Sequence, residues 1–372
     1  MRVLFTAVPI YGHLLPLLPL AEAVVAAGDE AAVAAPASMA QLAGGVPAIA
    51  GGPEPQELLA ENDRRTGGAD MADTRDIFPV ASFFAGARVD LTYDVALAQA
   101  KDFGPDVIVA EEYDAVGPMV AAALRLPLVR HGIGLPVSPP PLGPAMRELL
   151  APRYAGRGLA PARRVALVDP WPPALQYPQW TPAADRLPIR PRAYAGPLPV
   201  EPPLPPPGPA PRVLVTLGTV LLDPAMLEAL VGAVAELSDV DVLAVVPPGL
   251  PVPPADGRAN VRFAGFVPMA RLLDTGVSAV VAAGGAGTVL AALGRGIPMV
   301  LWPKGAEKPM NAERVAAAGA GIAVDAPGGA AEAVRKVLTD GSYRAGAGRI
   351  AEQIRQAPEP AEVWSRLRDR IR

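Results

Sequence analysis

The chain has 372 residues, of which 51% are hydrophobic and 19% charged, so it has enough apolar material for two folded domains and is not disordered as a whole. Its 33 basic and 37 acidic residues give a net charge of −4, which disfavours nucleic acid and anionic membranes as partners. Because cysteine is absent, disulfides and thiolate chemistry are excluded, and two histidines are too few for a multi-histidine metal site.

Short aliphatic runs alternate with alanine-rich segments in the first part of the chain. The elements that we predict from this alternation are strands at 3–8, 30–35, 107–110 and 127–130 and helices at 14–27 and 115–124. Continuous apolar strands separated by helices indicate a parallel sheet that is covered on both faces. Proline-rich loops interrupt the pattern at 139–144 and 169–182.

Two apolar stretches are similar in length to targeting or membrane segments. Residues 1–28 begin with an apolar run, but Pro16 and Pro19 interrupt it, as expected for a strand, a turn and a helix. Residues 276–294 are uncharged, but their glycine content favours a buried β-α-β unit over a membrane span. We therefore expect a cytoplasmic protein with no membrane span.

A proline-rich stretch at 196–211 is the clearest boundary, because prolines stiffen the chain and exclude a helix or a central strand. The elements predicted after it are strands at 212–218, 240–246, 261–263, 279–282 and 299–302 and a helix at 225–237. The predicted organisation is a domain at 1–200, a linker at 201–211, a domain at 212–344 and C-terminal helices at 345–372 that pack back on the first domain. Two such α/β domains leave a cleft that faces the carboxyl ends of both sheets.

His13 stands at the mouth of the first predicted sheet, where a strand ends and a helix begins. A general base that faces a bound ligand would occupy this place, and so would a half-buried histidine that caps a helix. Neither predicted sheet begins with the glycine pattern of a dinucleotide-binding turn, and the chain has no P-loop motif. These absences disfavour a nicotinamide cofactor and P-loop hydrolysis.

The run "VVAAGGAGTVL", residues 280–290, is an apolar segment that ends in glycines and then resumes. It predicts a buried strand, a glycine turn and the start of a helix, a layout that presents backbone N–H groups to an anion. No basic residue stands beside it. The helix end alone offers several N–H donors and about half a positive charge, which is enough to dock a phosphate.

Six segments form an ordered set along the chain: "GHLLPLLPLA", "RPRAYAGPLP", "VTLGTV", "FAGFVPMARLL", "GGAGTVLAALGRGIPMVLWP" and "NAERVAAAGAGI". The set resembles the GT-B glycosyltransferases, in particular the actinobacterial enzymes that place TDP- or UDP-linked sugars on natural products. The resemblance implies an α/β, GT-B fold with two Rossmann-like β/α/β domains that face each other across a cleft. It also implies that the domain at 1–200 binds the acceptor and that the domain at 212–344 binds the nucleotide sugar.

The resemblance gives His13 the role of the base that takes the proton from an acceptor hydroxyl. An acidic residue on the loop after "DVIVA" would hold and polarise it, and Glu111 is the best aligned candidate, with Glu112 and Asp114 as neighbours. The pairing is chemically sensible because a carboxylate bonded to one ring nitrogen raises the basicity of the other. For Glu111 and Glu112 the alternative is a solvated loop.

The resemblance also implies a set of donor-binding residues in the second domain. These are Thr219 and the turn Gly284, Gly285, Ala286, Gly287 and Thr288 around the diphosphate, Phe266 and Val267 at the base, and Glu307 and Lys308 at the donor sugar.

Two departures from the family pattern fall in this donor half. Ala282 and Ala283 stand where the family has a histidine before the glycines, and Glu307 and Lys308 stand where it has Asp-Gln. One lost charge-assisted hydrogen bond is worth about 1.5–3 kcal/mol, which weakens catalysis without abolishing it. Our hypothesis is that Lys308 supplies the missing positive charge, and the alternative is a solvated surface lysine.

Aromatic residues of the first domain are candidates for the acceptor pocket. We predict Phe83 and Tyr113 as acceptor-binding residues, together with His131, which follows a predicted strand. The other candidates in predicted loops are Phe78, Phe84, Trp171 and Trp180. Such rings also anchor loops, and a structural role is the alternative for His131.

The implied function is an inverting, metal-independent transfer of a deoxysugar from TDP or UDP to a small polyketide-like or aromatic acceptor. No further cofactor, nucleic acid or membrane is expected to bind, and a homodimer is left open. The alternative is a catalytically weak GT-B homologue that assists another glycosyltransferase. A nucleotide-sugar epimerase on the same fold would need further acid and base residues, which we do not find in the sequence.

Overall fold

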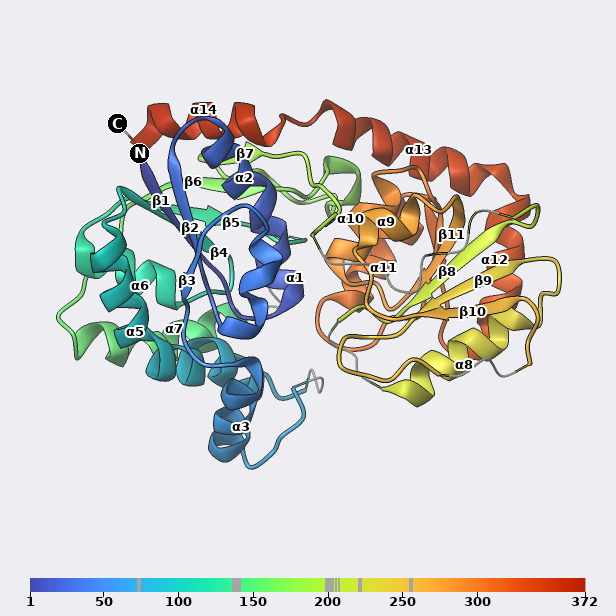
Figure 1. Cartoon of the computed structure of the whole chain (residues 1–372), viewed down its shortest axis with the longest axis horizontal. Helices are drawn as coiled ribbons and strands as arrows, with labels where there is room; N and C mark the ends of the chain where they lie inside the picture. Colours follow the sequence, from blue (N-terminus) through green and yellow to red (C-terminus); the bar gives the residue numbers. More distant parts are fainter. Residues whose placement is uncertain are drawn as a thin grey trace. The chain divides into compact units, whose positions relative to one another are not determined.

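The computed structural model describes residues 1–71, 75–135, 142–197, 204, 206, 208–219, 223–253 and 257–371. Five residues of the predicted linker (201–203, 205 and 207) and 139–141 of the predicted loop 139–144 lie outside the described residues. The chain divides into two compact units (Figure 1). The first unit comprises Met1–Trp171, Thr181–Arg190 and Ala357–Arg372, and the second comprises Pro172–Trp180 and Pro191–Gln356.

The described part of the first unit is built on one sheet of seven parallel strands. The strands are β1 Arg2–Thr6, β2 Glu30–Ala35, β3 Ala48–Ala50, β4 Val107–Glu111, β5 Leu128–His131, β6 Arg164–Asp169 and β7 Arg186–Pro188. Their order across the sheet is β3-β2-β1-β4-β5-β6-β7. The central strands β1 and β4 are almost entirely buried, which explains why both are continuous apolar runs in the sequence.

Helices cover both faces of this sheet (Figure 1). They are α1 Tyr11–Leu14, η1 Leu15–Leu17, α2 Leu18–Ala26, η2 Ala37–Ala43, α3 Pro55–Thr66, α4 Phe78–Ala81, η3 Ser82–Ala87, α5 Arg88–Phe103, α6 Val116–Leu124, α7 Leu142–Ala155 and α14 Pro360–Ile371. Helices α5 and α6 pack on one face, in a core with Leu4 and Ile108. Helices α2 and α14 pack against each other on the opposite face.

Two predicted elements of the first unit differ from the structure. The single helix predicted at 14–27 is divided into α1, η1 and α2, with Pro16 and Pro19 in the first turns of η1 and α2. Proline lacks the N–H group that a continuing helix needs, so the helix restarts at each proline. The loop predicted at 139–144 is also wrong in part, because α7 begins at Leu142.

The described part of the second unit is built on a sheet of six parallel strands. They are β8 Arg212–Thr216, β9 Asp241–Val245, β10 Val261–Ala264, β11 Val277–Ala282, β12 Met299–Leu301 and β13 Gly321–Ala323. Their order is β10-β9-β8-β11-β12-β13. The helices are η4 Pro173–Leu175, α8 Pro224–Ala235, α9 Met269–Leu273, α10 Ala286–Leu293, α11 Lys308–Ala317, η5 Pro327–Gly329, α12 Ala330–Thr339 and α13 Gly341–Gln356. Helices α8 and α12 share one apolar core with this sheet.

The two C-terminal helices belong to different units. Helix α14 packs against α2 in the first unit, where Trp364 Nε1 donates a hydrogen bond to Asp29 Oδ2 at 2.8 Å. Helix α13 belongs to the second unit, which ends at Gln356. The segment 345–372, predicted as one C-terminal piece, is thus divided between the second unit, which includes α13, and the first unit, which includes α14.

Each sheet reverses its strand order once. The first sheet grows from β1 to β3 and then continues with β4 on the other side of β1, and the second grows from β8 to β10 and continues with β11 on the other side of β8. Thr6 pairs with Ala110 and Thr216 pairs with Ala282, so the carboxyl ends of these neighbouring strands are aligned. Open parallel sheets bind ligands at this reversal, which marks one candidate place in each unit.

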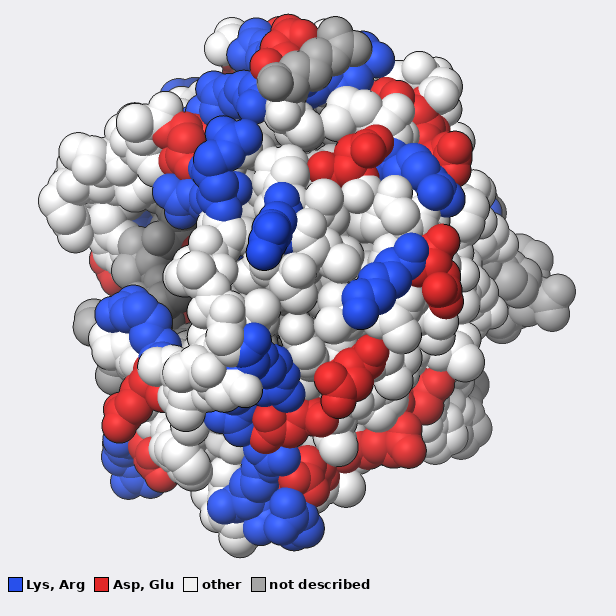
Figure 2. Space-filling view, turned by 90° about the vertical axis from the view of Figure 1, so that its left-hand side faces the viewer, with Lys and Arg blue, Asp and Glu red and all other residues white. Residues whose placement is uncertain are grey.

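The helices and the surface bear on the expectations about membranes and nucleic acid. None of the helices in the described ranges combines the length and the apolar content that crossing a membrane requires. On the face drawn in Figure 2, basic and acidic side chains are interspersed. That face therefore lacks the continuous basic stripe with which proteins follow a nucleic acid backbone.

Candidate active site

His13 and Glu111 meet at the strand reversal of the first sheet. His13 lies in α1, a few residues after β1, and Glu111 is the last residue of β4. Because β1 pairs with β4, the side chains converge, and His13 Nδ1 lies 3.0 Å from Glu111 Oε2. The Glu111 side chain is fully buried, whereas 15% of the His13 side chain is exposed. The pair thus joins a buried carboxylate to an imidazole that a ligand can reach.

The Glu111 carboxylate is also held by the chain that follows it. Its Oε1 accepts a hydrogen bond from the backbone N–H of Tyr113 at 2.6 Å. Glu111 was predicted on a loop, with a solvated side chain as the alternative, and both are wrong because Glu111 ends the strand and is buried. A buried carboxylate needs partners, and this N–H group provides one for Oε1, while the His13 ring lies beside Oε2.

The two neighbouring acids have different surroundings. Asp114 is fully buried and pairs with the buried Arg88, with Arg88 Nε 3.4 Å from Asp114 Oδ1, so its partner is an interior residue of the first unit. Glu112 directly follows β4, and burial raises its pKa to about 7. The charge of Arg130 opposes this rise, and the charge of Glu111 adds to it. Of the three acids, Glu111 is the one whose contact with His13 the structure shows.

Aromatic rings surround His13. The ring centres of Phe84 and Tyr113 lie 5.6 and 5.8 Å from that of His13. Phe83 packs edge-on against Phe84, with ring centres 5.4 Å apart, but only 3% of Phe83 is exposed. Phe78, Phe83 and Phe84 lie on α4 and η3, so their predicted placement in loops is wrong. Phe84 and Tyr113 are therefore better placed than Phe83 to contact an acceptor beside His13.

His131 is an interior residue of the first sheet. It is the last residue of β5, none of its surface is exposed, and its Nδ1 lies 2.7 Å from the carbonyl oxygen of Gly132. Burial lowers its pKa to about 4, so the ring is neutral at pH 7. The prediction placed His131 after the strand as an acceptor contact, and the structure instead supports the structural alternative. Trp171 is likewise buried, with 1% exposed.

The predicted glycine turn lies at the strand reversal of the second sheet. Strand β11 ends at Ala282, and α10 begins at Ala286 after Gly285. Between them Gly284 has a φ of +91°, in the region that favours glycine. The first bond within α10 runs from the N–H of Val289 to the carbonyl of Gly285. The N–H groups of the first turn therefore have no partner inside the helix.

The turn after β8 reaches the same edge of the second sheet. The hydroxyl of Thr216, the last residue of β8, accepts a hydrogen bond from the N–H of Gly218 at 3.1 Å. Thr219 follows and is half-buried, as is Thr288 in the first turn of α10, whereas Gly287 is exposed. The two turns thus border one accessible place at the strand reversal.

Lys308, the first residue of α11, lies against the glycine turn. A Cβ atom added to Gly284 would come within 3.4 Å of the Lys308 carbonyl oxygen and 3.7 Å of its Cβ. Only 7% of Lys308 is exposed, so the solvated alternative is wrong. Lys304, by contrast, is exposed and has its Nζ 5.0 Å from the ring centre of Trp302. Glu307 is half-buried and directly precedes α11.

The predicted base-binding residues, Phe266 and Val267, connect β10 to α9 at the same edge of the second sheet. Phe266 is half-buried, whereas only 6% of Val267 is exposed. That the backbone of this segment holds a nucleoside base stays a prediction.

Asn311 contacts the glycine turn and is not among the predicted site residues. It lies in α11, is fully buried, and donates a hydrogen bond from Nδ2 to the carbonyl oxygen of Gly284 at 2.9 Å. The segment "NAERVAAAGAGI" begins with this residue, so its place in the family pattern was the available signal. The sequence around Asn311 does not indicate that its hydrogen-bond partner is Gly284, which lies 27 residues away.

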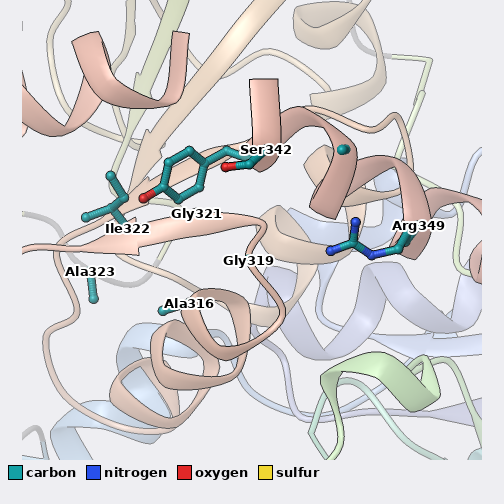
Figure 3. A pocket seen from close by; sticks show the side chains of 9 residues that line it. Ala316, Gly319, Gly321, Ile322, Ala323, Ser342 and Arg349 are labelled. Carbon is teal, nitrogen blue, oxygen red and sulfur yellow. The ribbon is translucent and has the colours of Figure 1, made fainter. Parts of the chain in front are cut away.

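A pocket of about 660 Å³ lies elsewhere in the second unit, beside the edge strand β13. Figure 3 shows Ile322 and Ala323 of β13 on one side and Ser342 and Arg349 of α13 on another. Its lining is mostly small or apolar and includes none of the predicted site residues. Within the described ranges, no three histidine or acidic side chains gather in a way that could hold a metal ion.

Comparisons with known proteins show the family to which the chain belongs. Residues 230–369 match the family "Erythromycin biosynthesis protein CIII-like, C-terminal domain". The chain is 33% identical to elloramycin glycosyltransferase ElmGT of Streptomyces olivaceus, over 99% of this chain and 97% of that protein. It is 30% identical to the glycosyltransferase SsfS6 of Streptomyces sp. SF2575, solved with thymidine diphosphate, with a TM-score of 0.82 and 99% of both chains covered.

A third relative was solved with both kinds of ligand. The spinosyn rhamnosyltransferase SpnG is 28% identical, with a TM-score of 0.80 over 99% of this chain and all of that one, and has structures with spinosyn aglycone and with thymidine diphosphate. The two parallel sheets match the GT-B architecture of these proteins. The chain belongs to the GT-B glycosyltransferases related to the actinobacterial enzymes of antibiotic and macrolide biosynthesis.

Proposed function

We propose that this glycosyltransferase transfers a deoxysugar from TDP to a hydroxyl group of a small polyketide-like or aromatic acceptor, with inversion at the anomeric carbon. The observation that carries the proposal is the contact between His13 and Glu111 at the strand reversal of the first sheet. SpnG was solved with an aglycone and with TDP, and SsfS6 with TDP, which supports TDP over UDP as the nucleotide.

His13 acts as the general base in this proposal. With Nδ1 held at 3.0 Å from the Glu111 carboxylate, the proton acceptor is Nε2, the ring nitrogen on the other side. It takes the proton of the acceptor hydroxyl as the oxygen attacks the anomeric carbon. The bond from that carbon to the diphosphate breaks in the same step, so a single displacement inverts the configuration. Phe84 and Tyr113, which border His13, supply an apolar wall for the acceptor.

The second unit supports the departing nucleotide. The diphosphate gains negative charge as the sugar leaves, and the N–H groups at the start of α10 and the adjacent Lys308 stabilise that charge. Thr219 adds a hydroxyl, the Phe266 and Val267 segment holds the base, and Glu307 contacts the sugar. We propose that these groups act without a metal ion, because they already provide N–H donors and a positive charge.

The test combines binding with turnover. Calorimetric titration should show TDP binding to the wild type and to the His13→Ala variant, because the nucleotide is held by the second unit. Sugar transfer from a TDP-deoxysugar to a panel of aglycones should be seen for the wild type and fall by about 10²- to 10⁴-fold in the variant. Turnover that survives the loss of His13 would refute the assigned base.

The auxiliary-protein alternative rests on the departures that the family resemblance implies in the donor half, namely the two alanines Ala282 and Ala283 and the lysine Lys308. A protein of that kind would have no need of an intact base and its carboxylate. A wild type that binds neither TDP nor UDP would favour this alternative over the enzyme.

A further inference from the structure

We infer that Asn311 is a positioning residue for the leaving group: its side-chain amide orients the glycine turn so that the turn can hold a diphosphate. The inference deepens the proposed function and rests on it. It starts from the 2.9 Å hydrogen bond from Asn311 Nδ2 to the carbonyl oxygen of Gly284. Because a carbonyl oxygen can only accept, the NH₂ end of the amide must face it.

The bond fixes the direction of the next backbone N–H group. The peptide between Gly284 and Gly285 is planar and trans, so its C=O and N–H groups point in opposite directions. The carbonyl points at Asn311 in α11, so the N–H of Gly285 points away from α11. Gly285 and the first turn of α10 are half-buried or exposed, so this N–H lies on the accessible side of the turn.

Backbone freedom at the turn makes such an anchor necessary. Gly284 has a φ of +91° and Gly285 follows it, and two successive glycines have more accessible conformations than any other pair. The chain lacks a side chain at Ala283 that would contact the anion directly. The orientation of the N–H groups therefore contributes more to the binding of the diphosphate here than in a turn that is preceded by a histidine.

The environment of Asn311 indicates that packing alone does not explain the amide. The side chain is fully buried, and its Oδ1 has no hydrogen-bond partner among the described residues. An unpaired buried oxygen costs stability, whereas an apolar side chain of the same shape would fill the space without that cost. Among the described residues, the hydrogen bond to Gly284 is the interaction that requires a donor at position 311.

The first unit provides a matched control. Asn62 in α3 is also fully buried, donates one hydrogen bond from Nδ2 to a backbone carbonyl, that of Pro79 at 3.2 Å, and has an unpartnered Oδ1. Its bond goes to α4 and not to the glycine turn. The same change at both positions therefore removes the same kind of bond, and only one of the bonds reaches the proposed diphosphate site.

The test compares Asn311→Leu, Asn62→Leu and the wild type by calorimetric titration with TDP and with thymidine, which lacks phosphate. TDP affinity should fall about tenfold or more in Asn311→Leu, the cost of one hydrogen bond to a charged group, with thymidine affinity and the TDP affinity of Asn62→Leu unchanged. Unchanged TDP affinity in Asn311→Leu, or an equal loss for TDP and thymidine, would overturn the inference. A wild type that does not bind TDP would instead refute the proposed function.

A second variant covers the case in which leucine prevents folding. Asn311→Asp keeps the shape, but its ionised carboxylate cannot donate to the Gly284 carbonyl, whereas the protonated acid can. Its TDP affinity relative to the wild type at the same pH should therefore be low at pH 8 and recover as the pH falls to 5. A ratio that does not change with pH contradicts the inference.

Discussion

Two side chains of the first unit, the half-buried Glu112 and the fully buried His131, are expected to respond to pH in opposite directions. Glu112 follows β4 and has its pKa raised to about 7 by burial, and His131 ends the neighbouring β5 and has its pKa lowered to about 4 by burial. In the unfolded chain the reference values are 4.5 and 6.5. Each group therefore binds protons differently in the two states, and the free energy of unfolding depends on pH.

The signs follow from the direction of each change in pKa. His131 has a lowered pKa, so the stability that it contributes is present above pH 6.5 and is lost as the pH falls towards 4. Glu112 has a raised pKa, so its contribution is present below pH 4.5 and is lost as the pH rises through 7. Each effect amounts to about 3 kcal/mol at 1.36 kcal/mol per pH unit. Between pH 4.5 and 6.5 the two effects oppose each other in the wild type.

Urea denaturation between pH 4 and 7.5 separates them. Glu112→Gln should leave the His131 effect uncompensated, so the variant loses about 3 kcal/mol relative to the wild type as the pH falls from 6.5 to 4.5. His131→Asn keeps a donor for the Gly132 carbonyl and should lose a similar amount as the pH rises from 4.5 to 7. His13→Ala is the control, because it removes the other histidine and leaves both effects in place. Variant curves parallel to that of the wild type would refute the reasoning.

Three further predictions concern the proposed site. Glu111→Gln should lower turnover by about 10²- to 10⁴-fold with TDP affinity unchanged, because His13 loses its carboxylate partner; equal losses in binding and turnover would contradict this. Lys308→Ala should weaken TDP binding about 10- to 150-fold, whereas Lys304→Ala, which removes an exposed lysine, should bind as the wild type does; equal affinities for the two variants would count against a diphosphate contact. Gly284→Ala forces a Cβ into a φ of +91° and should lower the free energy of unfolding by about 1–2 kcal/mol in urea denaturation, together with TDP affinity; a variant as stable as the wild type would show that the turn tolerates a side chain.

The parallel sheets were predictable because their strands are apolar at nearly every position. The prediction of a strand at 30–35 coincides with β2, and the predicted helix at 115–124 matches α6 to within a residue. The glycine turn was predicted with similar accuracy, since α10 begins at Ala286. In these places the local pattern and the tertiary structure favour the same conformation, so the sequence alone is sufficient.

Several helices of the first unit were not predicted. Helix α3, Pro55–Thr66, buries little more than Leu58 and Asn62, so it has no apolar stripe that sequence periodicity could detect. Its start is fixed instead by a capping box between Glu54 and Glu57. The aromatic segment of η3 was interpreted as a loop, and its helical form depends on packing against α3, α5 and α7.

The site residues, like the helices and strands, were predictable from the sequence only in part. That His13 and Glu111 each follow or end a strand was visible in the sequence, but their 3.0 Å contact depends on the pairing of β1 with β4 across about a hundred intervening residues. The burial of Lys308 and the bond from Asn311 to Gly284 likewise depend on how α11 packs against the turn.

The sequence by itself determined the class of fold, the positions of its main strands along the chain, the glycine turn and the candidate base, because each of these follows from residues close together in the chain. Only the tertiary structure decided which acid meets the histidine, which lysine is buried and which amide holds the turn. Those contacts join residues far apart in the chain, and their geometry is set by strand order and helix packing, to which local patterns are blind.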